Sequence, residues 1–508
     1  MIWLVSFTFS IWKSLAGDNK NQAVQVLAGG ILSPTAKWRT NFGFDIVNLL
    51  WASPAICNVS NAYPENEVII KGHISLSGNT TLYALRGTDG TILWSISFFG
   101  MDPSSPACGD LDGDGLDEIV TKTFSDGLKA LDNDGTVLWT FPTTYSFSSP
   151  KIEDVVSSSP GPEVIFMDPS GGNLVLYVLS ASGTPIWTAN VGIAEQPAAT
   201  PAISDIDGDG VKEIIIATLY SGLRVYDGQT GTLEWSYFAL AINPTPSVID
   251  LNNDGIEDIL FSNSSTIMAI SGTGTFMWSF NLRAHTPPSD THVVLMEYVA
   301  PVWDINGDGF PEIWLGDGGD SSNVNSHLLR IDQNGSSASI NWLYGINQWA
   351  YDGGGGLVDI NNDGIWDFIK AADNGYVYAV RADNGTPVWN FRFDNCGSGV
   401  IDPSVAIGDI DADNCSEVVI IGCQSSFLGG NIVAVAIDNS TPVSSCAVLS
   451  RDDELKASEM KPYEGGEFKV YTTSGRLMGT FKPGQRIKLK PGFYIVKMGT
   501  KTKGVLVK

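Results

Sequence analysis

Short alternating apolar segments, separated by glycine-containing turns, recur along most of this chain. Each repeat of this pattern consists of an apolar strand, a turn and a second strand that carries a tryptophan, as in LKALDNDGTVLWTF at residues 128–141. Strict alternation predicts strands with one buried face, and the turns are of the kind that closes a β-hairpin. A large ring repeated once per unit is best interpreted as packing between units. The equivalent tryptophans are Trp94, Trp139, Trp187, Trp235, Trp278, Trp342 and Trp389.

A second motif, rich in aspartate, precedes these hairpins. Residues 205–216 read DIDGDGVKEIII, with acidic side chains at every second position and glycines that allow a tight loop. The β-branched run after the loop predicts a buried strand. Two worn copies, residues 56–70 and 152–166, keep this strand but lack the acidic triplet. Intact copies begin at Asp110, Asp205, Asp250, Asp304, Asp359 and Asp409.

The side-chain oxygens of each intact copy indicate a metal ion. Three or four carboxylates packed this closely repel one another unless a cation neutralises them. Calcium, a hard cation that takes oxygen ligands, is the expected ion. We expect no metal in the two worn copies. The predicted ligands are Asp110, Asp112, Asp114, Glu118, Asp205, Asp207, Asp209, Glu213, Asp250, Asn252, Asp254, Asp258, Asp304, Asn306, Asp308, Glu312, Asp359, Asn361, Asp363, Asp367, Asp409, Asp411, Asp413 and Glu417.

The two motifs together predict an all-β fold made of repeated units. Each unit supplies a strand before the acidic loop, the strand after it and a tryptophan hairpin, which makes four antiparallel strands. A sheet this small must stack on its neighbours, and radial closure into a β-propeller leaves only short edges. Eight units predict an eight-bladed propeller, with seven blades as the alternative. Residues 25–43 resemble a tryptophan hairpin without its loop, so we expect Trp38 and its strand to complete the last blade.

Charge divides the chain into parts. The net charge of the 508 residues is −27, which makes nucleic acid an improbable partner because phosphates would be repelled. From residue 451 onward, however, there are 13 Lys and Arg against 6 Asp and Glu. Such a break indicates a domain boundary. We therefore expect a propeller at 23–450, a linker at 451–466 and a small β-sandwich at 467–508.

The N-terminus begins with an apolar run from Ile2 to Trp12, which is too short to span a bilayer. One interpretation of residues 1–22 is a signal or leader segment, with Ser14-Leu15-Ala16 as the cleavage site. The other interpretation is an ordinary strand or a misplaced start codon. No other segment is a transmembrane candidate, so we expect a soluble or surface-attached protein.

Six cysteines leave the disulfide pattern open. Cys396, Cys415, Cys423 and Cys446 cluster in the last repeat, where one or two disulfides would clamp the closing blade of an exported protein. Cys57 and Cys108 stand near corresponding positions of neighbouring repeats and are a second candidate pair. The alternative is six buried thiols.

The acidic loops resemble the FG-GAP/VCBS repeats of calcium-binding propellers, as in integrin α-subunit heads. The LxALxxxTGxxxW hairpins are similar to those of eight-bladed quinoprotein (PQQ-like) propellers, and the two resemblances together cover about residues 23–450. In the FG-GAP family the acidic loop lies between the first two strands of a blade and holds structural Ca²⁺. The resemblance therefore implies about six structural Ca²⁺ sites, one in each intact loop.

The tail resembles another family. Its pattern VYTTSGRLM … LKPGFYIVK … VLVK, in residues 467–508, is similar to the C-terminal sorting domain of type IX secretion substrates in Bacteroidetes-like bacteria. The resemblance implies an outer-membrane secretion machinery as partner, transport across that membrane, and then cleavage of the tail or anchoring on the cell surface. The alternative is a generic accessory β-domain.

No catalytic motif identifies an enzyme. The sequence has no G-x-S-x-G, no HExxH and no P-loop. We therefore expect a secreted or surface-displayed binding module for a glycan, protein or matrix ligand. The runner-up is a polysaccharide lyase or another carbohydrate-active enzyme. Two long connections, residues 282–298 and 316–327, are candidate binding loops, and they contain His285, His292 and His327. They would line one mouth of the ring together with Trp349, Tyr351 and Gly353–Gly356.

Overall fold

The computed structural model describes most of the repeat region and the strands of the tail. The described residues are 12–14, 17–45, 52–74, 79–100, 104–123, 126–144, 148–193, 200–218, 220, 222–239, 245–263, 266–284, 300–317, 326–346, 354–372, 374–393, 405–424, 430–440, 446, 468–472, 477–481, 492–498 and 501–507. They fall into two compact units, one of which spans Ser10–Cys446.

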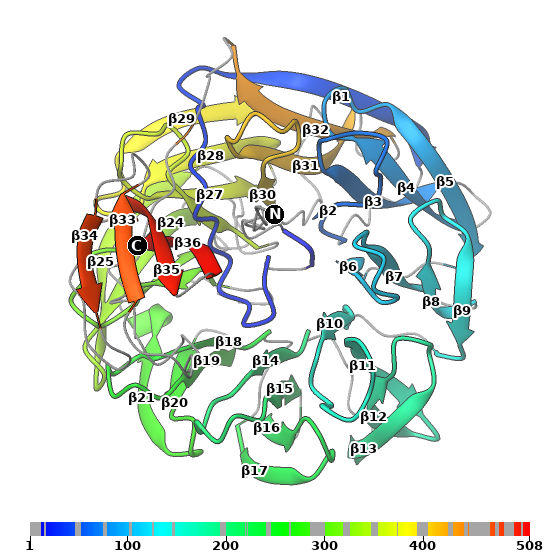
Figure 1. Cartoon of the computed structure of the whole chain (residues 1–508), viewed down its shortest axis with the longest axis horizontal. Coiled ribbons are helices and arrows are strands. Elements are labelled where there is room, and N and C mark those ends of the chain that lie inside the picture. Colours follow the sequence, from blue (N-terminus) through cyan, green and yellow to red (C-terminus); the bar gives the residue numbers. More distant parts are fainter. Residues whose placement is uncertain are drawn as a thin grey trace. The chain divides into compact units, whose positions relative to one another are not determined.

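This larger unit consists of eight four-stranded antiparallel sheets set around a common centre (Figure 1). In seven of them the strands follow one another in chain order, and the short first strand lies innermost. Eight blades are therefore confirmed, and the alternative of seven is wrong. The first four blades are β2 (Ala55–Cys57), β3 (Glu67–Ile74), β4 (Asn79–Arg86), β5 (Ile92–Phe99); β6 (Ala107–Gly109), β7 (Glu118–Thr123), β8 (Gly127–Leu131), β9 (Val137–Phe141); β10 (Lys151–Glu153), β11 (Glu163–Ser170), β12 (Asn173–Leu179), β13 (Pro185–Ile193); and β14 (Ala202–Ser204), β15 (Glu213–Thr218), β16 (Gly222–Asp227), β17 (Leu233–Tyr237).

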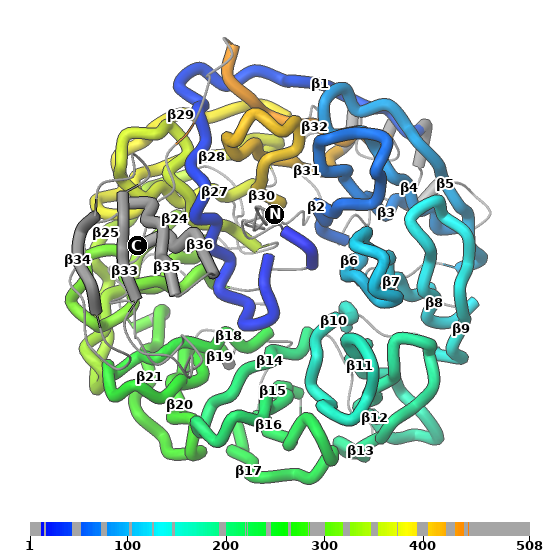
Figure 2. The backbone as a smooth tube through the Cα atoms, in the orientation of Figure 1, coloured from blue at the N-terminus to red at the C-terminus, as the bar shows by residue number. Residues whose placement is uncertain are grey.

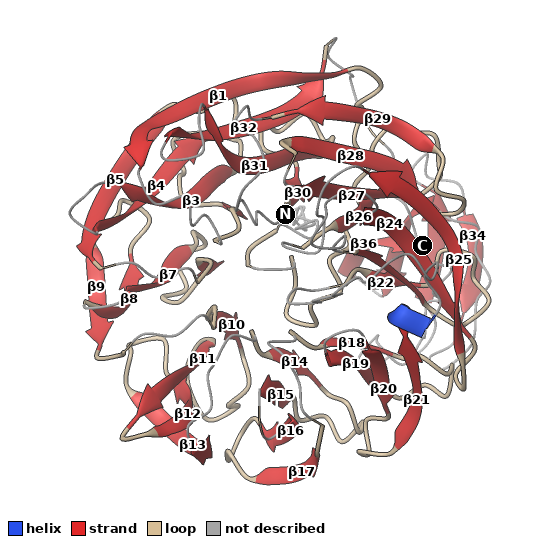
Figure 3. Cartoon of the chain, turned by 180° about the vertical axis from the view of Figure 1, so that it is seen from behind, coloured by secondary structure: helices blue, strands red, loops and turns tan. Residues whose placement is uncertain are grey.

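The next four blades repeat this plan. A single 3₁₀ turn, η1 (Leu282–Ala284), follows β21 and is the one helical element among the described residues (Figure 3). The strands are β18 (Ser247–Ile249), β19 (Asp258–Asn263), β20 (Thr266–Ile270), β21 (Phe276–Asn281); β22 (Val302–Trp303), β23 (Glu312–Gly316), β24 (Ser326–Gln333), β25 (Ala338–Ile346); β26 (Gly356–Val358), β27 (Asp367–Ala372), β28 (Tyr376–Arg381), β29 (Pro387–Arg392); and β30 (Ala406–Gly408), β31 (Glu417–Gln424), β32 (Gly430–Asn439).

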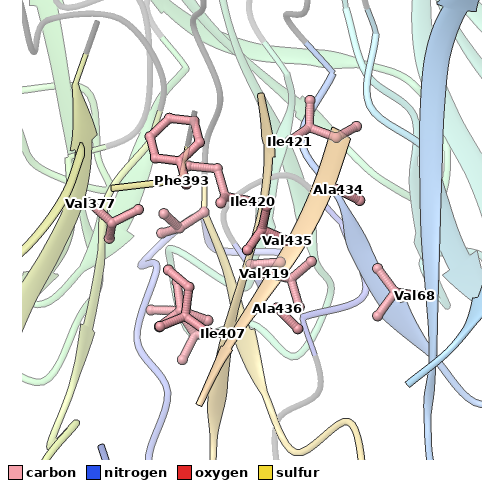
Figure 4. Close-up of a cluster of buried hydrophobic side chains, with 14 of the residues drawn as sticks. Val68, Val377, Phe393, Ile407, Val419, Ile420, Ile421, Ala434, Val435 and Ala436 are labelled. Atoms are coloured by element: carbon pink, nitrogen blue, oxygen red, sulfur yellow. The ribbon is translucent and has the colours of Figure 1, made fainter. Parts of the chain in front are cut away.

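The eighth blade is completed by the start of the chain. Strand β1 (Pro34–Asp45) pairs antiparallel with β32, and Trp38 stands opposite Ala436. The sheet order β1-β32-β31-β30 thus joins both ends of the repeat region in one blade. This confirms that Trp38 and its strand close the ring. Figure 4 shows the apolar core around this blade, in which Val419 and Ile420 of β31 lie near Val435 of β32.

The repeated tryptophans pack between blades, as their spacing predicts. In five of them the indole N–H donates to a main-chain carbonyl in the hairpin of the next blade; one example is Trp187 Nε1, 2.9 Å from Gly228 O. The buried Nε1 atoms of Trp278 and Trp389 have no hydrogen-bond partner among the described residues. A side chain has no room beneath the ring, since a Cβ added at Gly231 would lie 2.5 Å from the Trp187 ring. Equivalent bonds join Trp38 to Gly87, Trp94 to Asn133, Trp139 to Ala181 and Trp342 to Ala382.

Residues 12–14 and 17–31, which we call the inner segment, run inside the ring of blades (Figure 2). The segment reaches the first strand of every blade. In the third blade, Lys151 Nζ donates to Asp18 O of the inner segment (2.6 Å). In the eighth blade, Ile407 O accepts a hydrogen bond from Gln25 Nε2 of the inner segment (3.1 Å). In the other six blades a backbone N–H donates to a carbonyl of the inner segment: Ile56 to Trp12, Cys108 to Lys13, Ile203 to Asn19, Val248 to Lys20, Val302 to Gln22 and Leu357 to Ala23.

The predicted leader, residues 1–22, overlaps this inner segment. Trp12 is 2% exposed and lies in the core cluster of the closing blade, and the Ser14 hydroxyl is 3.0 Å from Lys151 Nζ. Leu15, Ala16 and residues 1–11 lie outside the described residues. The part of the candidate leader that the structure describes is therefore integrated into the propeller.

The strands of the tail form one four-stranded antiparallel sheet in the order β34-β33-β35-β36. They are β33 (Phe468–Thr472), β34 (Leu477–Phe481), β35 (Gly492–Met498) and β36 (Lys501–Val507). The sheet agrees with the predicted strands, whereas a second sheet, which a sandwich requires, is not among the described residues. No helix in the described part of the chain is long and apolar enough to cross a membrane.

Candidate metal sites

Each intact acidic loop joins the first and second strands of one blade, as the FG-GAP resemblance implies. Loop 205–213, for example, leaves β14 and enters β15 at Glu213. Because the four strands of a blade are antiparallel, the acidic loops and the tryptophan hairpins lie at the same edge of the ring. The two long connections leave from the end of β21 and run from the end of β23 to the start of β24, and these strand ends lie at the opposite edge.

Within each loop the backbone wraps around the first aspartate. Asp205 Oδ1 accepts a hydrogen bond from Gly208 N (2.8 Å), and its Oδ2 accepts one from Gly210 N (3.0 Å). Both glycines have positive φ, +79° and +90°, which side chains disfavour. The backbone of Asp209 donates in turn to Asp207 Oδ1 (3.0 Å). These bonds turn the carboxylates toward the inside of the loop.

The last acid of the motif makes the same main-chain contact in all eight blades. Glu213, for example, accepts a hydrogen bond from Ile206 N (2.7 Å). Since Glu67 and Glu163 of the worn copies do the same, this contact belongs to the blade fold and does not depend on the acidic triplet. The remaining bonds run from Val59 to Glu67, Leu111 to Glu118, Val155 to Glu163, Leu251 to Asp258, Ile305 to Glu312, Ile360 to Asp367 and Ile410 to Glu417.

The second oxygen of this acid is buried without a hydrogen-bond partner in most blades. Among the described residues this holds for Glu67, Glu118, Glu163, Glu213, Asp258, Asp367 and Glu417. Burial raises the pKa of Glu213 to about 8 and that of Glu118 to about 7. Glu312 differs, because Arg330 Nη2 contacts its Oε1 at 3.0 Å. A buried carboxylate oxygen without a partner is costly, and a bound cation would satisfy it.

In four intact loops the acids converge. One ligand atom from each residue of the group lies within 4.8 Å of the others, and the groups are Asp110, Asp112, Glu118; Asp205, Asp207, Glu213; Asp304, Asp308, Glu312; and Asp409, Asp411, Glu417. Loops 250–258 and 359–367 place an asparagine in the triplet, and Asn252 Oδ1 accepts from Asp254 N (2.9 Å). Carboxylate and amide oxygens of this kind are ligands suited to Ca²⁺. The worn copies have no such convergence among the described residues.

The third acid takes part in only one of these groups. Asp308 belongs to its group, whereas Asp114, Asp209 and Asp413 do not. Instead, Asp209 Oδ1 accepts a hydrogen bond from Val211 N (2.7 Å), which closes the end of the loop. In three of the four groups the structure therefore brings together the first, second and fourth predicted ligands, and in loop 304–312 it brings together the first, third and fourth.

The candidate binding loops are only partly described. His327 ends its connection and lies in β24, and its Nδ1 is 2.9 Å from Oδ2 of the fully buried Asp317. His285, His292, Trp349 and Tyr351 lie outside the described residues. Their predicted convergence at one mouth of the ring is therefore untested.

Two disulfides connect parts of the ring. Cys57–Cys108 joins the first strands of the first two blades, which confirms the candidate pair. Cys415–Cys446 joins the acidic loop of the closing blade to the residues after β32, as expected of a clamp on that blade. Cys396 and the side chain of Cys423 lie outside the described residues.

A series of hydroxyl groups across the first five blades was not predicted. The backbone N–H of Ser53 donates to Ser105 Oγ (2.9 Å), and that of Ser105 donates to Ser149 Oγ (2.9 Å). Thr200 and Thr245 continue the series through the next blades. A proline follows every one of these residues, immediately before the first strand of a blade. This Ser/Thr-Pro repeat is the sequence signal that identifies the contacts between blades.

Comparison with known proteins agrees with this architecture. A model of the FG-GAP-like repeat matches residues 205–261, and a model of the lambda-carrageenase β-propeller domain matches residues 79–190. A comparison with curated protein sequences finds no match.

Solved structures share the fold at low sequence identity. The quinohemoprotein alcohol dehydrogenase ADHIIG of Pseudomonas putida HK5 is 11% identical, with a TM-score of 0.58 over 88% of this chain and 83% of that chain. The V. cholerae biofilm matrix protein Bap1 is 13% identical, with a TM-score of 0.56 over 89% of this chain and 97% of that chain. A europium-containing methanol dehydrogenase is 10% identical, with a TM-score of 0.57 over 84% of this chain and 98% of that chain. The repeat region of the chain is thus an eight-bladed β-propeller, in which residues 205–261 match an FG-GAP-like repeat.

Proposed function

We propose that this protein is a calcium-binding propeller, secreted or displayed on the cell surface, that acts as a binding module for a glycan, protein or matrix ligand. The observation that carries the calcium assignment is the convergence of buried and exposed carboxylates within 4.8 Å in four loops. Each ion would neutralise its loop and fix the turn between two strands. At ten times its Kd, one such ion would stabilise the fold by about 1.4 kcal/mol.

Chelation tests the calcium assignment. The melting temperature of the full chain, followed by tryptophan fluorescence, should fall when EDTA replaces excess Ca²⁺. The double substitution Asp207→Ala/Asp209→Ala should remove the contribution of one loop only. Asp154→Ala, in a worn copy, is the matched control and should leave the calcium response unchanged. An equal midpoint in EDTA and Ca²⁺ would remove calcium from the proposal.

Export is supported by separate features of the chain. Two disulfides suit an oxidising compartment, and residues 467–508 would be read by the outer-membrane secretion machinery. The test compares the full chain with a chain ending at residue 466 in a bacterium that has type IX secretion. The full chain should reach the medium or the cell surface, and the shortened chain should stay inside. Equal export of both would rule out the tail as the signal.

A carbohydrate-active enzyme is the second candidate function. The match of residues 79–190 to the lambda-carrageenase propeller model favours it. Because the protein is strongly acidic, we expect a sulfated or carboxylated glycan to bind only where calcium bridges the two. Carrageenan and other acidic polysaccharides should therefore be retained in Ca²⁺ and released in EDTA, with neutral agarose as the control. New unsaturated products would identify a lyase, new reducing ends alone would identify a hydrolase, and binding without products would support the binding module.

A further inference from the structure

The residue before each repeated tryptophan occupies a β-bulge on the outermost strand. In the closing blade, Ala36 and Trp38 pair with Ile437 and Ala436, so Lys37 is the extra residue. In the fourth blade, Leu233 and Trp235 pair with Tyr226 and Val225, so Glu234 is the extra residue. A bulge re-aims the side chain that it carries. Here the re-aimed side chain comes close to the acidic loop of its own blade.

Lys37 turns its ammonium group into the acidic loop of the closing blade. Its Nζ lies 2.5 Å from Asp411 Oδ2 and 2.8 Å from Asp438 Oδ2, and the Lys37 side chain is 16% exposed. Asp411 is one of the three converging acids of this loop. The loop therefore already contains a positive charge supplied by the chain itself.

Glu234 adds the opposite charge to the fourth blade. Glu234 is exposed, and its carboxylate interacts electrostatically with Asp207 and Asp209. No lysine or arginine forms an ion pair with a predicted ligand of loop 205–213 in the described part of the chain. The loop therefore has four acids of its own and a fifth nearby.

At the other bulges the residue is uncharged. These residues are Leu93, Leu138, Ile186, Met277, Asn341 and Val388. Lys37 and Glu234 are therefore the two bulge positions at which the outermost strand changes the charge of an acidic loop. Like charges at these distances repel and opposite charges attract, so both residues alter the affinity of the loop for a cation.

We propose that the bulge residue sets the calcium affinity of the neighbouring loop, an inference that rests on the proposed calcium function. Lys37 acts as a built-in cation that replaces calcium in loop 409–417, and Glu234 strengthens calcium binding in loop 205–213. Because Lys37 belongs to β1, the strand that closes the ring, the closing blade stays neutralised when calcium is withdrawn. Loops 304–312 and 359–367 keep a partial counter-charge, from Arg330 beside Glu312 and from Arg381, 3.9 Å from Asp363 Oδ2, whereas the remaining intact loops lose their cation under the same conditions.

Removal of the Lys37 charge and reversal of the Glu234 charge test this proposal. In full-length protein freed of metal, the number of Ca²⁺ ions bound at a low fixed free calcium concentration is counted by native mass spectrometry or calorimetry. Lys37→Met should raise this number by one, and Glu234→Lys should lower it by one, with at least a tenfold change in the affinity of one site. Lys129→Met is the matched control, because Lys129 Nζ contacts the Thr140 hydroxyl and no acidic loop (3.2 Å).

Stability in EDTA gives a second readout with opposite signs. Lys37→Met should lower the melting temperature in EDTA and recover it with excess Ca²⁺, whereas Glu234→Lys should raise the melting temperature in EDTA. If Lys37→Met does not fold, Glu234→Lys alone still tests the proposal. Six equal sites that neither variant changes would overturn this inference and leave the calcium function standing. No bound ion in any variant would overturn the calcium function itself.

Discussion

The indole N–H of Trp38 donates a hydrogen bond to Gly87 O across 2.6 Å, from the closing strand to the first blade. The ring of Trp38 also covers Gly90, where an added Cβ would lie 2.7 Å from it. The equivalent bonds of Trp94, Trp139, Trp187 and Trp342 join two consecutive blades, whereas that of Trp38 joins the last blade to the first. This contact therefore holds the two ends of the repeat array together.

Trp38→Ala should lower the free energy of unfolding by about 3–5 kcal/mol, since it removes a buried aromatic ring. Trp38→Phe keeps most of the packing and loses the hydrogen bond, so its cost should be about 1 kcal/mol. Urea unfolding, followed by circular dichroism, measures both values. An alanine variant as stable as the phenylalanine variant would contradict a packing role for the ring.

Gly231→Ala should be more destabilising than Gly208→Ala. Both glycines have positive φ, +71° and +79°, so both changes carry the same backbone strain. Only Gly231 lies beneath a tryptophan ring, while nothing lies within 4 Å of a Cβ added at Gly208. The difference between the two melting temperatures therefore reports the clash with Trp187. Equal melting temperatures would show that the ring can move aside.

The inner segment should be sensitive to a single atom exchange at Asn21. The Asn21 side-chain amide donates to Pro201 O (3.2 Å) and Pro246 O (2.9 Å), in neighbouring blades. Asn21→Asp replaces this donor by an acceptor, so two buried carbonyls lose their partner, at about 1–3 kcal/mol for each unsatisfied group. Asn334→Asp is the control, because Asn334 Oδ1 only accepts hydrogen bonds from Ser336 and Ser337. Thermal unfolding of both variants should therefore show a loss for Asn21→Asp alone.

A pH dependence follows from the buried acid of the first blade. Burial raises the pKa of Glu67 to about 7 from its ordinary value of 4.5. A carboxyl with a raised folded-state pKa keeps its full stability below pH 4.5 and loses it as the pH rises toward 7. Glu67→Gln removes the charged form and keeps an acceptor for Val59 N. The free energy of unfolding of Glu67→Gln, relative to that of the wild type, should therefore rise by about 3 kcal/mol between pH 5 and pH 8.

Urea unfolding in EDTA at several pH values measures this gain. EDTA keeps the acidic loops free of metal, so that calcium binding does not add its own pH dependence. Glu153→Gln is a suitable control, because Glu153 is partly exposed and pairs with Lys212. Parallel pH profiles of the wild type and Glu67→Gln would show that Glu67 titrates normally in the folded protein.

The repeat spacing was sufficient to predict the blades, their number and the closing role of Trp38. Each of these depends on local pattern: alternation, turn glycines and one tryptophan per unit. The Cys57–Cys108 pair was predictable for the same reason, because the two cysteines stand near corresponding positions of adjacent repeats, third in β2 and second in β6.

Residues that act through register were not predictable from the sequence. Lys37 and Arg330 approach acidic loops from other strands, and only the pairing of strands brings them there. The last acid was predicted solely as a metal ligand, although its main-chain contact also occurs at Glu67 and Glu163. The inner segment contacts successive blades through irregularly spaced main-chain and side-chain groups, so it has neither a helical nor a strand period, and the apolar run before it resembles a leader.

Closure by the first strand has a consequence for how the chain folds. Lys37 and Asp438 are 401 positions apart, yet they meet in one sheet. The loop-closure entropy must be overcome before such distant contacts form, so folding should be slow. During synthesis β1 emerges first and finds its partner β32 last. Its unpaired edge must stay protected from aggregation until nearly the whole ring has left the ribosome.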